Sequence, residues 1–129
     1  MREQIIETVA NHLRQLDAKY FHWLGRPLDN DEFPAIVMND TESNIDDDSG
    51  HTLKIEISVI LSDGVDSTIA KDTRVLMQQV SFAIRDALEE ICLFGKLRKT
   101  KLDAQSSEFA YIAGVMLFEI RYTADEWSI

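Results

Sequence analysis

The spacing of hydrophobic residues changes several times along this 129-residue chain, and these changes constrain the fold more than any other feature. Between residues 5 and 20, hydrophobic residues recur every three or four positions, which predicts a helix with one buried face from about residue 2 to residue 19. Between residues 53 and 61 they alternate with polar residues, which predicts a strand with one face in the core. The chain must therefore combine helices and strands around one core.

The same patterns continue to the end of the chain. A second helix is expected from either Asp66 or Asp72, since both can cap a first turn, to Ile91, with Gly95 ending it. Three further strands are predicted: a short one at 33–38 that begins near a proline, a basic one at about 96–102, and a long one at about 109–123.

The last predicted strand is apolar on both of its faces. One face carries Met116, Phe118, Ile120 and Tyr122, and the other carries Tyr111, Ala113, Val115 and Leu117. A strand of this kind needs cover on both sides. Two helices cover only one side of a sheet, so we expect a neighbouring subunit to cover the other.

The order helix, strand, strand, helix, strand, strand predicts an α+β fold. We expect two helices packed on one face of a mostly antiparallel four-stranded sheet. The length suits a single domain, residues 1–129. Residues 39–50 are rich in Asp, Asn, Ser and Gly, and they predict a flexible acidic loop.

Charge is sorted along the chain into two blocks. Residues 29–48 contain eight acids and no Lys or Arg, among them Asp46, Asp47 and Asp48. Residues 96–101 contain four bases: Lys96, Arg98, Lys99 and Lys101. One interpretation is that these cations protect an exposed strand edge against aggregation. The other is that they contact acidic partners, in which case copies of the chain attract one another head to tail.

The sequence contains no recognisable catalytic or ligand-binding signature. His12, His22 and His51 lack metal-ligand spacing, so we expect surface or cap histidines. The run from Asp46 to Asp48 imitates only the start of a calcium loop, since no Glu follows until Glu56. Neither a phosphate-binding loop nor a nucleophile elbow is present. We therefore expect no enzyme activity, no cofactor and no metal.

Composition narrows the partners further. A formal charge of −10 disfavours direct nucleic-acid binding and anionic membranes, and no run of residues is apolar enough to span a bilayer. Cys92, the single cysteine, is expected as a small buried residue. Trp23 is expected to close the core, whereas Trp127 either tucks onto the domain or anchors a partner.

The layout resembles that of the tail terminator (tail completion) proteins of long-tailed bacteriophages and prophages. The resemblance covers nearly the whole chain, and Phe33-Pro34-Ala35-Ile36 and the aromatic-rich last strand carry most of it. The other matching segments are Ile5-Ile6-x-x-Val9-x-x-x-Leu13, Leu24-Gly25-Arg26-Pro27, Leu53-x-Ile55-x-Ile57-x-Val59 and Val115-Met116-Leu117-Phe118-Glu119-Ile120-Arg121-Tyr122.

The resemblance implies a small subunit of a hexameric ring that caps the tail tube, ends its polymerisation and presents a surface for head joining. The implied partners are copies of the chain, the tail tube protein and the head-tail connector protein. The implied locations are the host bacterial cytoplasm during assembly and then the virion tail. We expect the interface to include Asp46, Asp47, Asp48, Lys96, Arg98, Lys99, Lys101 and Trp127. The competing hypothesis is a regulatory α+β domain that binds a small molecule.

Overall fold

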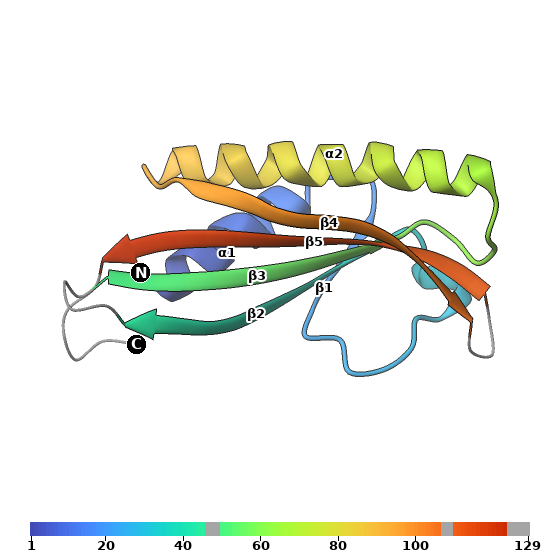
Figure 1. Ribbon diagram of the computed structural model, residues 1–129, viewed down its shortest axis with the longest axis horizontal. Helices are drawn as coiled ribbons and strands as arrows, with labels where there is room; N and C mark the ends of the chain where they lie inside the picture. Colours follow the sequence, from blue (N-terminus) through green and yellow to red (C-terminus); the bar gives the residue numbers. More distant parts are fainter. Residues whose placement is uncertain (46–49, 107–109, 124–129) are drawn as a thin grey trace.

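The computed structural model describes residues 1–45, 50–106 and 110–123, which form two helices and a five-stranded sheet (Figure 1). The helices are α1 (Arg2–Leu13) and α2 (Ser67–Glu90), and a short 3-10 helix, η1, spans Asn30–Glu32. The strands are β1 (Lys19–His22), β2 (Ala35–Ile45), β3 (Gly50–Ile60), β4 (Gly95–Ser106) and β5 (Ala110–Thr123).

The strands lie in the order β1-β2-β3-β5-β4, so that β4 and β1 are the two edges. Strand β1 runs parallel to β2, and the other three pairs are antiparallel. The predicted α+β class is confirmed. The prediction of four strands is wrong, because the sheet has a fifth strand and is mixed.

Strand β1 was missed because its hydrophobic residues continue the helical spacing of the segment before it. The helix predicted to reach residue 19 ends at Leu13, and the chain then turns and pairs with β2 from Lys19 onward. Leu16 and Tyr20 still pack against the core from these positions. Their spacing of three and four residues therefore looks helical, although neither residue is in a helix. A strand of four residues is also too short to show a recognisable alternation.

The two helices cover the same face of the sheet. One core cluster contains Ile5, Val9 and Leu13 of α1, several residues of α2, and alternate residues of β2, β3 and β5. Figure 1 shows α1 behind the strands and α2 along the β4 side. We call the opposite surface the open face, which carries Val115 and Leu117 of β5 at half-buried positions.

Helix α2 begins and ends with identifiable caps. Asp66 is the N-cap, because its carboxylate accepts a hydrogen bond from the Ile69 amide at 2.8 Å. The helix ends at Glu90, and Cys92, two residues later, has a φ of 57° that lets the Leu93 amide donate to the Leu88 carbonyl. The prediction that Gly95 ends the helix is wrong, since Gly95 begins β4.

Two other local expectations differ from the structure. Residues 39–45, expected in the acidic loop, continue strand β2, because they pair with β3 from Glu56 to His51. The rest of that loop, residues 46–49, lies outside the described residues. Cys92, expected to be buried, is exposed, because it occupies the turn that follows the helix.

The left-handed conformation of Cys92 leads to a stability prediction. A residue with a Cβ pays about 1 to 2 kcal/mol in this region, and glycine avoids most of that cost. We expect Cys92→Gly to raise the free energy of unfolding by about 0.5 to 1 kcal/mol after the added unfolded-state entropy is included. Urea denaturation measures this change. Cys92→Ala serves as the control, because it removes the thiol and keeps the Cβ; an equal gain in both variants would contradict the explanation.

Candidate assembly surfaces

The basic residues lie along the edge strand β4. Register places Lys96, Lys99 and Lys101 opposite Glu119, Leu117 and Val115 of β5. Those β5 residues alternate with the buried Met116, Phe118 and Ile120, so the three lysines belong to the open face. Arg98 occupies a bulge between Leu97 and Lys99 and reaches the same face, where its Nε donates to Glu119 at 3.2 Å.

Local ion pairs neutralise only part of this edge. Besides the pair of Arg98 with Glu119, the Lys101 ammonium lies 3.0 Å from the Asp103 carboxylate. Both cations are about half exposed, so neither pair adds much stability. Within the described residues, Lys96 and Lys99 have no acidic side chain within 4.0 Å. The N-terminal half of β4 therefore keeps unpaired positive charge at the sheet edge.

The acidic segment lies on the other side of the sheet, in β2 and the turn before it. Its first part is neutralised locally, because Arg26 donates two hydrogen bonds to Glu32, at 2.6 and 2.7 Å. Arg26, together with the Asp29 amide, lowers the pKa of Glu32 to about 2. Asp31 is exposed and contributes its backbone carbonyl to Lys19.

Asp40 is the one acid of this segment that the described structure buries, at 8% exposure. Its carboxylate accepts hydrogen bonds from Arg2 at 2.8 Å, His22 at 2.7 Å and Trp23 at 2.7 Å. Burial pushes the pKa of Asp40 up, but these three donors outweigh it and hold the pKa at about 2. Asp40 is thus an internal anchor and is not available to an acidic docking surface.

Trp23 was expected inside the core, and the structure contradicts this. The residue directly follows β1, has a φ of 55°, and is 57% exposed while its indole N–H is held by Asp40. Nothing in the local sequence marks this orientation, because it depends on a carboxylate 17 residues away. A half-exposed tryptophan with a fixed ring is typical of a contact site.

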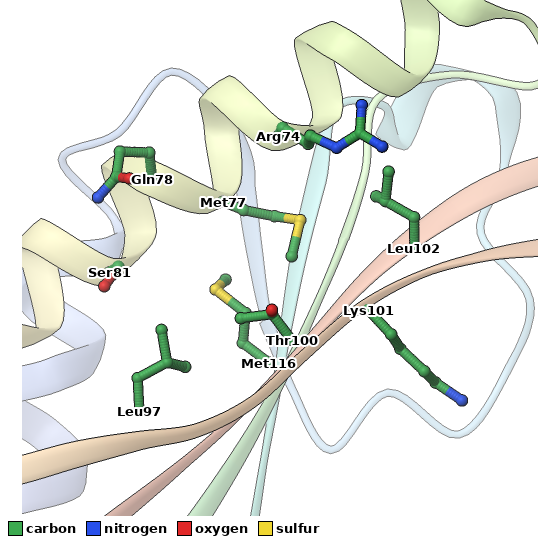
Figure 2. Close-up of a pocket in the computed structure, with 9 residues that line it drawn as sticks. All are labelled: Arg74, Met77, Gln78, Ser81, Leu97, Thr100, Lys101, Leu102 and Met116. Carbon is green, nitrogen blue, oxygen red and sulfur yellow. The ribbon is translucent and has the colours of Figure 1, made fainter.

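Exposed apolar residues also flank the basic edge. Phe94 is 87% exposed and Leu97 is 44% exposed. On the helix side, a groove of about 490 Å³ separates α2 from β4, and Leu97 lies in its lining. Figure 2 shows Met77 of α2 and Met116 of β5 at the centre of this groove, while Lys101 points away from the helix. The edge of β4 is therefore apolar on one face and cationic on the other.

The open face is covered at one end by the chain itself. The segment that contains η1 packs there and leaves a pocket of about 330 Å³ lined mainly by apolar groups, among them Leu28, Phe33, Val37 and Tyr111. The sequence led us to expect that a neighbouring subunit covers this face. Part of that cover is intramolecular, and Val115 and Leu117 remain half exposed on the rest.

Several predicted interface residues lie outside the described residues, namely Asp46, Asp47, Asp48 and Trp127. His51, expected at the surface, is 1% exposed and stacks on Tyr122, with ring centroids 5.0 Å apart. Among the described side chains, no group of three or more His, Cys, Asp or Glu could hold a metal ion. Within the same residues, neither helix combines the length and apolar character that a membrane crossing requires.

No protein-family model and no curated protein matches this sequence.

The Asp40 cluster leads to a pH-dependent prediction. Because the folded-state pKa lies below the ordinary value of 3.8, this stabilisation is present above pH 3.8 and is lost as the pH falls toward about 2. We expect Asp40→Asn to lower the free energy of unfolding at pH 7 by about 2 kcal/mol. The deficit relative to wild type should shrink by pH 3, measured by urea denaturation.

Asp31→Asn is the matched control, since it removes one exposed charge from the same acidic segment. A loss of similar size in both variants would show that net charge, rather than the buried hydrogen bonds, causes the effect.

Proposed function

We propose that the protein is a structural subunit that assembles head to tail into a ring and caps a bacteriophage or prophage tail tube. The observation that carries this proposal is the placement of the two charge blocks. The basic strand β4 forms one edge of the sheet, and the described part of the acidic segment lies in β2 and the turn before it, near the other edge. Opposite charges on opposite edges favour heterologous contacts, which generate closed rings or filaments.

The distance between the edges strengthens this argument. Strands β3 and β5 separate β2 from β4, so these two strands lie about 14 Å apart at ordinary strand spacing. That separation exceeds the Debye length of about 8 Å at physiological ionic strength. The blocks therefore interact weakly within one copy, and direct contact between two copies offers the stronger attraction.

The resemblance to tail terminator proteins supplies the rest of the proposal. The succession of helices and strands that carried the resemblance is present, with β1 as an addition. On this basis the ring is hexameric, its partners are the tail tube protein and the head-tail connector protein, and its role is structural rather than catalytic. Assembly takes place in the host cytoplasm, and the ring remains in the virion tail.

One observation favours a second function, a domain that binds a small molecule. The pocket of about 330 Å³ on the open face falls within the size range of ligand sites, and Arg26, Asn30, Ser58 and Asp63 add polar groups to its apolar lining. A ligand-binding domain does not need subunit contacts, so the oligomeric state separates the two functions.

The ring proposal predicts salt-sensitive self-association. Sedimentation velocity between about 0.05 and about 1 M NaCl should show an oligomer at low salt that dissociates as the charges are screened. Negative-stain electron microscopy of the low-salt sample should show rings. A protein that stays monomeric at every salt concentration would refute self-assembly in free solution and favour the ligand-binding alternative.

The capping role has its own test. Added to polymerising tail tube protein from the same gene cluster, the protein should end growth and leave shorter tubes with a ring at one end. Tube lengths measured by electron microscopy provide the readout. Tubes of unchanged length would refute the capping role even if the protein forms rings.

A further inference from the structure

Both edges of the sheet have free segments, and these segments lie at the same level. Strand β1 pairs only with residues 35–38 of β2, so within the described part of the chain residues 39–45 have no neighbouring strand on that side. We call two residues level when successive register partners connect them across the sheet. Thr41 is level with Lys96 in this sense, because Lys54 and Glu119 lie opposite each other between them. Asn39 is level with Lys99 through Glu56 and Leu117 in the same way. A copy shifted sideways thus brings the free part of β2 against the N-terminal half of β4.

Strand direction and charge both favour this contact. Because three successive pairs are antiparallel, β2 and β4 run in opposite directions, and a neighbouring β2 beside β4 would form a further antiparallel pair. Besides the internally bonded Asp40, residues 39–45 include one acid, Glu42, and no base, whereas Lys96 and Lys99 are cations without an acidic partner among the described residues. Pairing β4 with a second β4 would instead bring two sets of four cations together, which is unfavourable.

Apolar groups match at the same level on the helix side. Leu97 is level with Asp40 through Phe118 and Ile55. Asp40 holds the indole of the exposed Trp23, and Leu97 and its neighbour Phe94 are themselves exposed. A neighbouring copy therefore presents a fixed tryptophan at the height of the exposed apolar residues of β4. A buried aromatic residue surrounded by polar pairs is the usual composition of an interface hot spot.

We infer that two copies join by antiparallel pairing of β4, residues 95–99, with β2, residues 39–45, of the next copy, and that Trp23 of that copy packs on Leu97 and Phe94. This inference rests on the proposed ring and names the surfaces that form it. The C-terminal half of β4 stays outside the contact, because it is level with the part of β2 that β1 already covers. When this contact between β4 and the next copy's β2 is repeated, every copy uses both of its edges.

Charge reversal tests the two edges separately. Lys96→Glu/Lys99→Glu should weaken self-association about 100-fold at low salt, because it places like charges across the pair. Thr41→Lys/Glu42→Lys should weaken it similarly from the other edge. Lys71→Glu is the control, since Lys71 is exposed on α2, away from both edges. Sedimentation velocity gives the association constants, and circular dichroism checks the fold.

Combining the variants makes the test specific for a head-to-tail contact. Neither double variant should assemble alone, but an equal mixture should form rings in which the two variants alternate, because the two altered edges fit each other and so do the two unaltered edges. The quadruple variant, with both edges reversed in one chain, should assemble again. Loss of assembly in the quadruple variant, with the fold intact, would overturn the inference.

Tryptophan fluorescence reports the apolar part of the contact. In a Trp127→Phe background only Trp23 emits, since the chain has two tryptophans. Its emission should shift to shorter wavelength on assembly, and amide exchange should slow in residues 39–45 and 95–99. If wild type forms rings and caps tubes while these signals and the charge variants show no effect, the strand pairing is wrong and the proposed function stands. If wild type remains monomeric at every salt concentration and leaves tube length unchanged, both are wrong.

Discussion

The carboxylate of Asp40 determines how the edge of this sheet is built. It joins the N-terminus of α1 through Arg2, the end of β1 through His22, and the residue after β1, Trp23. A buried carboxylate is unfavourable unless donors surround it, and here three donors converge on one side chain of β2. The indole of Trp23 donates to this carboxylate, β1 ends at His22, and among the described residues no further strand pairs with the rest of β2 at this edge.

Sheet topology then converts a linear charge pattern into two separate surfaces. The acidic and basic blocks do not touch each other, because β3 and β5 lie between them in the centre of the sheet. The central strands are held by burial of alternate residues under both helices, and this packing leaves the outer strands free to carry charge. The edge that bears the lysines is also the edge with exposed Phe94 and Leu97. Protection against aggregation alone does not require those apolar groups.

Sequence patterns predicted the longer elements, in which the hydrophobic period repeats several times. The helix from Ser67 to Glu90 and the strands β3, β4 and β5 were placed within a few residues of their ends. The errors occur where the signal is short or where two patterns coincide. Strand β1 has four residues, and the β2 extension has a polar composition that resembles a loop. In both places hydrogen bonding to a neighbouring strand outweighs local preference.

The candidate surfaces were only partly predictable for a related reason. Lys96, Lys99 and Lys101 could be placed on an edge strand, because runs of cations are rare in central strands. The exposure of Trp23 and the burial of Asp40 could not be predicted, because each depends on the other across 17 residues. The sequence by itself determined the α+β class, the charge blocks and most of the core. Only the tertiary structure decided which segments share an edge and a level, because strand order and register depend on contacts between residues far apart in the chain.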